Sequence, residues 1–273
     1  MAEAYRCDCQ ILTEHVSVAG YMAMDPIEKL RRLNIGAAVL HALQGMAVLI
    51  LTTSISLPVT AAFGNGPPGQ PSGPLELKRL FSYGIGYTVA VFLFLSAAFH
   101  LLVASPWGFP RYRAELERTR NRFRWVEYSL SASVMIVLIA GITGITDIVA
   151  LIALFGVNAS MILFGWLMET TNEPGPTANW LPFQFGCFAG SVPWIGIVIY
   201  LVGAGSDVPR FVYGIFVSLF IFFNCFAINQ WLQYRAKGRW TNYLFGERVY
   251  IILSLVAKSL LAWQVFANVL TPQ

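Results

Sequence analysis

The sequence predicts an all-α membrane protein, a bundle of seven transmembrane helices with its N-terminus in the cytoplasm and its C-terminus outside. Three observations carry this prediction. The 273-residue chain is 56% hydrophobic and only 12% charged, whereas soluble domains carry about 25% charged residues. Seven apolar stretches are long enough to cross a bilayer, and the basic residues are shared unequally between the joints that connect them.

The seven stretches follow one another through the whole chain after a polar start. A helix needs about 20 mostly apolar residues to cross a bilayer. The predicted spans are 34–56, 81–104, 123–143, 146–168, 181–202, 211–234 and 249–270. Only Gly144 and Ile145 separate the third span from the fourth. The sequence shows no repeat and no soluble domain large enough to fold alone, so residues 34–273 form one membrane domain. No cleavable signal peptide is expected, because the first apolar run is long enough to stay as an anchor.

Residues 1–33 are predicted to be a cytoplasmic tail that ends in a short surface helix. Asp25 and Pro26 open that helix, over 27–33, because Asp is a favoured N-cap and Pro a favoured first-turn residue. An external loop follows the first span, over 57–80, and its Gly, Pro and Asn residues are turn signals. A loop of this length usually has structure or function of its own.

A short hairpin that pairs 59–63 with 75–77 is predicted within this loop.

The four cysteines do not form a disulfide framework. Cys7 and Cys9 are too closely spaced for ordinary bridge geometry. A metal site that used Cys7, Cys9 and His15 would lack a fourth ligand, so no metal is predicted. Cys187 and Cys225 are interpreted as small core residues.

The basic residues give the orientation. Fourteen of the 18 Lys and Arg residues lie in the tail, between helices two and three, or between helices six and seven. Only Lys78, Arg79 and Arg210 lie on the opposite side. Because cytoplasmic segments carry the excess of Lys and Arg, the N-terminus is predicted inside. This bias accounts for the net charge of +4, so no nucleic-acid partner is inferred. The Arg-rich joint between helices two and three is interpreted as facing anionic lipid, with protein docking as the alternative.

Lys258 is the most informative residue, because it is the only basic residue in the apolar run 249–270. A charged lysine at the centre of a membrane helix costs several kcal/mol. It therefore faces protein or a cavity, and it is either paired with an acid or no longer a free amine. Glu127 is the candidate acid. Two readings remain open: a Schiff base to retinal with Glu127 as the counter-ion, or a Lys258–Glu127 ion pair without a ligand.

Other polar residues of the spans fall on the cytoplasmic side of Lys258, near Glu127. Helical spacing places Ser131 on the face of Glu127, Ser254 on that of Lys258, Ser96 with His100, and His41 with Gln44. The far halves of helices three to seven contain no ionisable partner for Lys258 except Asp147 near the membrane edge. These polar residues also have purely structural interpretations. Serines in membrane helices often bond their own backbone, histidines often join helices, and Glu127 could pair with Arg124.

Four stretches closely resemble the heliorhodopsins: 123–140, 148–166, 253–264 and the loop residues 65–69. The likeness covers about 34–272. Heliorhodopsins are seven-helix, retinal-binding photoreceptors with an inverted orientation, in agreement with the orientation that the basic residues give. Residues 1–24 have no counterpart in this resemblance.

The resemblance implies a role for individual residues. Lys258 would form the Schiff base to all-trans retinal, with Glu127 as its counter-ion. The residues implied around them are Ser96, Ser131 and Ser254 beside the pair, His41, Gln44 and His100 in a water-bearing cluster, Asn158, Phe226 and Gln233 in the retinal pocket, and Arg124, Tyr243 and Glu247 in a cytoplasmic polar closure. The family also implies a homodimer in the cell membrane.

The predicted function is a light sensor with a slow photocycle, not an enzyme, in contact with membrane lipid and with a cytoplasmic signalling partner that these residues do not identify. Pumping is not expected, because the far half lacks a carboxylate relay. Three alternatives remain. They are a light-gated proton channel or weak transporter, a transporter without retinal that uses Lys258 and Glu127 as a substrate-coupled pair, and a light-dependent regulator of a soluble enzyme through the Arg-rich joint.

Overall fold

The computed structural model describes residues 24–64, 76–205 and 208–270. Seven of its helices are long and apolar enough to cross a membrane, as predicted. They are α2 Pro26–Leu51, α3 Ile85–Ala104, α5 Arg122–Ile142, α6 Ile148–Thr171, α7 Leu181–Ala204, α8 Arg210–Arg235 and α9 Tyr243–Val265. Most of the predicted tail, with Cys7, Cys9 and His15, and the loop motif 65–69 lie outside the described residues.

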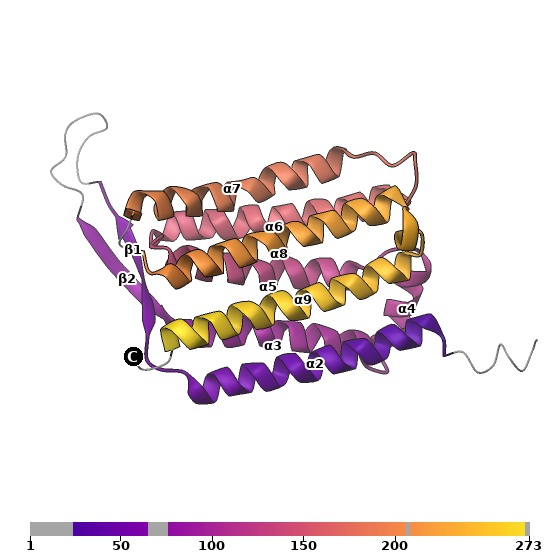
Figure 1. Ribbon diagram of the computed structural model, residues 1–273, viewed down its shortest axis with the longest axis horizontal. Helices are drawn as coiled ribbons and strands as arrows, with labels where there is room; N and C mark the ends of the chain where they lie inside the picture. Colours follow the sequence, from indigo (N-terminus) through magenta and orange to yellow (C-terminus); the bar gives the residue numbers. More distant parts are fainter. Residues whose placement is uncertain (1–23, 65–75, 206–207, 271–273) are drawn as a thin grey trace, which may run out of the picture.

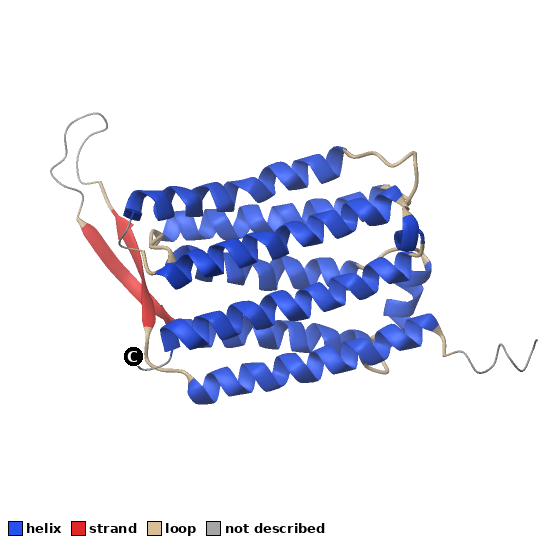
Figure 2. Ribbon diagram, viewed as in Figure 1, coloured by secondary structure: helices blue, strands red, loops and turns tan. Residues whose placement is uncertain are grey.

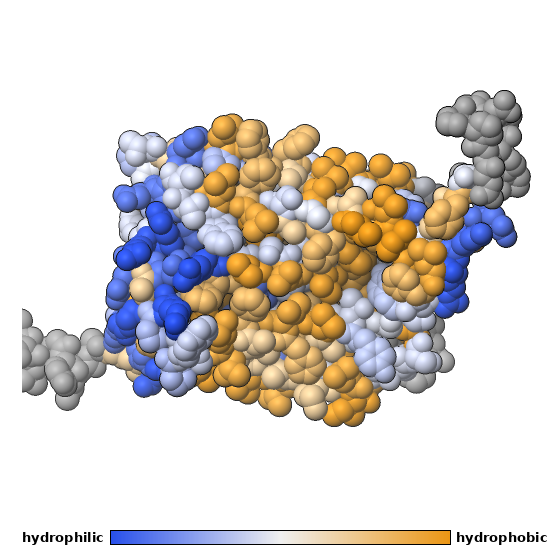
Figure 3. Space-filling view, turned by 180° about the vertical axis from the view of Figure 1, so that it is seen from behind, coloured by the Kyte–Doolittle hydropathy of each residue, from blue (hydrophilic) through white to orange (hydrophobic). Residues whose placement is uncertain are grey.

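The seven long helices lie side by side and alternate in direction (Figure 1). Short elements complete the chain: helix α4 Phe109–Glu117, the 3₁₀ turn Gly238–Thr241, the π-helical turn Phe266–Leu270, and strands β1 Ser56–Ala62 and β2 Leu77–Gly84 (Figure 2). We call the end with β1 and β2 the hairpin end. The opposite end, with α4 and the first turns of α2, α5 and α9, is the basic end, and hydrophilic residues gather there (Figure 3).

Helix α2 begins before residue 34, where the first predicted span starts. A separate surface helix over 27–33 was expected, but the structure has one continuous helix, α2, from Pro26 to Leu51. Its buried face continues unbroken through Ile27, Leu30 and Asn34, so the first turns pack like the rest. Asp25 caps this helix by accepting a hydrogen bond from the Ile27 amide at 3.0 Å. That bond, helped by Arg113, lowers the pKa of Asp25.

The external loop forms an antiparallel hairpin with a register other than the expected one. Val59 pairs with Phe81, and an irregularity separates Val59 from Thr60. Residues 81–84, expected to be helical, belong to β2, and α3 begins at Ile85. Thr60 attaches the hairpin to the joint between α5 and α6, because its amide donates to the Thr146 carbonyl at 2.9 Å.

The Arg-rich joint between α3 and α5 contains the amphipathic helix α4. Phe109, Tyr112 and Leu116 are buried along one face at helical spacing, while Arg111 and Arg118 are exposed. Burial raises the pKa of Tyr112 to about 12, so its hydroxyl stays protonated at neutral pH. The phenol lies beside Asn34 of α2, whose amide nitrogen is 3.4 Å from the hydroxyl oxygen. The joint is therefore docked onto the bundle.

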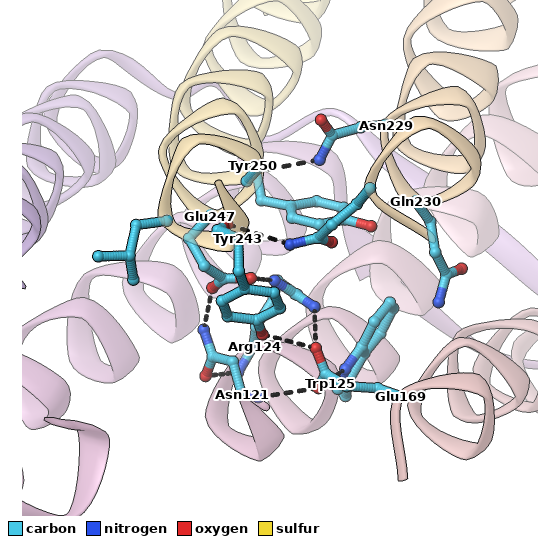
Figure 4. A network of polar contacts seen from close by, with 12 residues as sticks. Asn121, Arg124, Trp125, Glu169, Asn229, Gln230, Tyr243, Glu247 and Tyr250 are labelled. Atoms are coloured by element: carbon cyan, nitrogen blue, oxygen red, sulfur yellow. Dashed lines mark hydrogen bonds and ion pairs between the residues drawn. The ribbon is translucent and has the colours of Figure 1, made fainter. Parts of the chain in front are cut away.

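The interior of the bundle differs between its two ends. A large apolar cluster fills the hairpin half, with Phe92 of α3, Ile139 of α5 and Leu261 of α9 among its fully buried members. The buried charged residues of the described chain are Arg124, Glu127, Glu169, Glu247 and Lys258. They lie at mid-bundle or toward the basic end (Figure 4 shows the basic-end group).

Candidate functional site

Lys258 and Glu127 meet in the middle of the bundle. Lys258 of α9 is only 3% exposed, and its Nζ donates to Glu127 Oε1 of α5 at 2.8 Å. The same Nζ donates to Ser254 Oγ, one turn earlier on α9, at 2.8 Å. A buried charge is tolerated only with such partners. The pairing expected from the sequence is therefore present, and Glu127 does not pair with Arg124.

Ser96 and the two histidines extend this site toward α2 and α3. Ser96 Oγ donates to Glu127 Oε1 at 2.6 Å, while the rings of His41 and His100 stack with centroids 5.6 Å apart. His100 Nδ1 lies 2.6 Å from Asn34 Oδ1.

Several buried polar atoms beside the pair have no hydrogen-bond partner among the described residues. They are both ring nitrogens of His41, Gln44 Oε1, His100 Nε2 and Ser131 Oγ. Buried polar groups without a protein partner ordinarily bind water. This corner of the site therefore has the chemistry of a hydrated polar cluster, next to the Lys258–Glu127 ion pair.

An apolar cavity begins at the lysine. A space of about 50 Å³ is lined by Lys258, Ser254 and Ala257. A second space of about 270 Å³ extends from there between α7 and α8, past Gly186 and Gly190. Both are lined by Tyr128, Met161, Ile162, Phe223 and Phe226. Because they share these walls, the two spaces form one elongated apolar chamber with an amine at one end.

Of the three residues expected in the pocket, only Phe226 lines this chamber. Its ring packs edge-on against Tyr128, with centroids 5.3 Å apart. Asn158 is buried and donates to Ser133 Oγ at 3.0 Å, outside the lining of both spaces. Gln233 donates to the Tyr243 carbonyl at 3.2 Å and joins α8 to the start of α9.

A second buried ion network closes the basic end (Figure 4). Arg124 of α5 donates a hydrogen bond from one guanidinium nitrogen to Glu247 of α9. A second guanidinium nitrogen donates to Glu169 of α6 at 2.8 Å. The guanidinium also lies 3.9 Å from the centroid of the Tyr250 ring. Tyr243 joins the network, because its hydroxyl donates to Glu169 Oε1 at 2.8 Å. The three residues expected in a polar closure are therefore brought together.

Glu169, Asn121 and Trp125 are members of this network that sequence reasoning missed. Glu169 Oε2 accepts from the Asn121 amide at 2.8 Å and from Trp125 Nε1 at 2.5 Å, and Asn121 Nδ2 donates to Glu247 at 2.7 Å. The predicted span 146–168 ends one residue before Glu169, but this residue lies within α6 and is 1% exposed. One signal existed: it is the sole acid in the apolar stretch 148–171.

A small space of about 30 Å³ lies between the two networks. Glu127 and His100 line it on one side, and Arg124, Glu247 and Asn121 on the other. Polar groups of the lysine site and of the basic-end network thus face one shared cavity.

Comparisons with known proteins give a family and a fold. The family model described as Heliorhodopsin matches residues 30–270. Exiguobacterium sibiricum rhodopsin has a similar structure, with TM-score 0.60, 16% identity and coverage of 88% of this chain and 96% of that one. For cyanorhodopsin from the cyanobacterium Tolypothrix the TM-score is 0.60 at 13% identity, with 90% and 95% covered. A light-driven proton pump from Leptosphaeria maculans has a TM-score of 0.61 and 12% sequence identity, with 90% of this chain and 95% of that one covered. Functionally curated proteins gave no match.

Proposed function

This chain belongs to the heliorhodopsin family, and from that premise we propose that it is a light sensor in which Lys258 carries all-trans retinal as a protonated Schiff base. Glu127 is the counter-ion in this proposal. Its family consists of retinal photoreceptors of the membrane, so the chain is a protein of this kind. The observation that carries the residue assignment is the buried Lys258 Nζ, 2.8 Å from Glu127 Oε1 at one end of an apolar chamber.

The chamber fits a long apolar polyene. Its walls are aromatic and aliphatic side chains, including Tyr128, Phe223 and Phe226, and its one amine is Lys258. Ligand pockets of this kind combine mostly apolar walls with a few polar groups that fix orientation. Retinal, when bound, supplies absorption of visible light and isomerisation about a double bond. The protein supplies the shape of the chamber and the charge beside the nitrogen.

Glu127 stabilises a positive charge at the buried Lys258 Nζ. Burial disfavours a lone cation, and an opposite charge within about 4–6 Å favours it. Ser96 donates to the carboxylate at 2.6 Å, and Ser254 lies 2.8 Å from Nζ. A change in the direction of the N–H bond would therefore break a defined contact. The proton then has Glu127 Oε1 as its nearest acceptor, with the cluster of His41 and His100 behind it.

We do not expect a pump, because the buried ionisable groups near the pair, His41, His100 and the Arg124 network, lie on its basic-end side. The apolar cluster of the hairpin half lies beyond it, and Asp147 is engaged at the start of α6, where its Oδ1 accepts from the Ala150 amide at 2.9 Å. A proton released from Nζ has no carboxylate relay through the described hairpin half. It returns by the path that it took, which favours a slow cycle and a sensory role.

Light-gated proton conduction toward the basic end is the second candidate. The small cavity shared by Glu127 and Glu247 favours it, because water there would connect the two networks. Illumination of voltage-clamped cells separates the candidates: a sensor gives no steady current, while a channel gives a current that follows the proton gradient.

We also propose that the basic end is cytoplasmic, as the bias of Lys and Arg toward that end supports. A C-terminal tag should then react with an antibody on intact cells. Staining that requires permeabilised cells would reverse the orientation. A homodimer and a soluble signalling partner at the basic end follow as family expectations, and light-dependent pull-down tests the partner.

The chromophore assignment is tested by replacing the lysine. Protein expressed with all-trans retinal should be coloured, and Lys258→Ala should be colourless because the one amine of the chamber is gone. Lys237→Ala, at an exposed lysine of the α8–α9 joint, is the matched control and should keep its colour. A Lys258→Ala protein that retains covalent retinal would overturn the assignment.

A further inference from the structure

An open groove lies at the basic end, between the first turns of α2 and α9. Its volume is about 590 Å³, and its lining includes three basic residues, Lys29, Arg32 and Arg248. The other lining includes the apolar side chains of Leu30, Leu33, Leu244 and Phe245. The groove is separate from the retinal chamber and from the Arg124 network.

The three bases of the groove are exposed and have no ion pair among the described residues. The acids beside them are engaged elsewhere. Asp25 pairs with Arg113 at 2.6 Å, and Glu28 pairs with Arg31 at 3.4 Å. Three positive charges therefore face one concave surface without neutralisation from the described chain, which favours an anionic ligand.

Arg31, a basic residue next to the groove, has a structural role. Its Nε donates to the Ala104 carbonyl of α3 at 2.9 Å, which ties α2 to the end of α3. Arg32, the next residue, makes no such contact in the described structure and lines the groove instead. Structural demand therefore accounts for Arg31 and leaves Arg32 free to bind a ligand.

Exposed apolar side chains continue from the groove along both helices. On α9, Ile252 and Val256 follow Arg248 at four-residue spacing and are 43% and 41% exposed. On α2, Ile35 and Val39 follow Arg32 and are 44% and 52% exposed. A free inorganic anion would need only the bases. The basic residues of the groove, together with the exposed apolar residues that follow along α2 and α9, match a molecule with an anionic head group and acyl chains.

We propose that this groove is a binding site for an anionic phospholipid. Lys29, Arg32 and Arg248 bind the phosphate, and the acyl chains lie along the exposed faces of α2 and α9. Basic residues near a membrane surface each contribute about 1 kcal/mol to attraction of anionic lipid. The groove adds selectivity, because it gathers three such residues over an apolar floor. This site does not depend on retinal, so its failure and that of the light-sensing proposal are distinguishable.

The test compares two triple variants of the full-length protein in detergent. Lys29→Gln, Arg32→Gln and Arg248→Gln together neutralise the groove. Arg118→Gln, Lys237→Gln and Arg239→Gln together remove one lysine and two arginines that are exposed at the same end and lack ion pairs in the described structure. Native mass spectrometry with phosphatidylglycerol or phosphatidylcholine measures binding. Circular dichroism and gel filtration check folding.

The unaltered protein should bind phosphatidylglycerol more tightly than phosphatidylcholine. The groove triple should lose affinity for phosphatidylglycerol on the order of a hundredfold, given about fivefold for each base. The control triple should change by less than about threefold, because it lies outside the groove. If the groove triple does not fold, Arg248→Gln alone should lose about fivefold.

Three results would overturn the proposal. Equal losses in both triples would mean attraction by the whole basic surface. An absence of lipid preference in the unaltered protein would remove the site. Full displacement of the lipid by excess inorganic phosphate would mean that the groove recognises free phosphate instead.

Discussion

The two buried ion networks of this protein differ in charge and in how their carboxylate oxygens are bonded. The Lys258 network balances one cation with one carboxylate, and several polar atoms around it have no protein partner. The Arg124 network sets one cation against two carboxylates, and all four oxygens of Glu169 and Glu247 accept hydrogen bonds. A network whose carboxylate oxygens are all bonded holds helices in place. In the Lys258 network the bonds to Lys258 and Ser96 both fall on one oxygen of Glu127, Oε1, so we expect its bonding to change more readily.

The positions of the networks support this difference in role. Arg124, Glu169 and Glu247 join α5, α6 and α9 near the membrane edge, where loss of packing would admit water (Figure 4). Lys258 and Glu127 join α9 and α5 deeper in the bundle, beside the apolar chamber. We therefore expect the first network to act as a fixed closure and the second to be the site of the chemistry.

The largest expected effect is on stability, at Arg124. Arg124→Gln leaves Glu169 and Glu247 buried without their cation, and breaking a buried pair costs about 3–5 kcal/mol. Unfolding in mixed micelles of increasing denaturing detergent measures the loss. Arg118→Gln, at an exposed arginine, is the control and should change stability by less than about 0.5 kcal/mol. An Arg124 variant as stable as its control would mean that this network does not hold the helices.

A smaller effect should separate two serines near Glu127. Ser96→Ala removes the hydroxyl that donates to the carboxylate at 2.6 Å, and hydrogen bonds to charged groups contribute about 1.5–3 kcal/mol. The negative charge on Glu127 is then less stabilised, so the visible absorption maximum should move. Ser131→Ala removes a hydroxyl with no partner in the described structure and should move the maximum less. The opposite order of shifts would argue against Ser96 as a ligand of the counter-ion.

The sequence predicted those parts of the fold and site that follow from the free-energy cost of placing polar or charged groups in a membrane. Seven spans follow from hydropathy, and the Lys258–Glu127 contact follows from the expense of a lone charge in a membrane. The β2 strand was missed in part because residues 81–84 lie in an apolar run that hydropathy does not distinguish from a helix. Glu169 was missed because an acid at the end of a span resembles an interfacial residue until its burial is known. The first turn of α2 shares an apolar cluster with α4, and this packing cannot be read from the local sequence of α2.

Glu127→Gln tests the central claim most directly, with visible absorbance of the retinal-loaded protein titrated against pH. Removal of the opposite charge disfavours the protonated nitrogen, so the visible band should give way to a near-ultraviolet band at lower pH than in the unaltered protein. Its maximum should also shift. Glu169→Gln, which removes a carboxylate of the Arg124 network, should affect the band far less. An unchanged maximum and an unchanged titration in Glu127→Gln would contradict the assignment and point to Asp147 or a bound anion as the counter-ion.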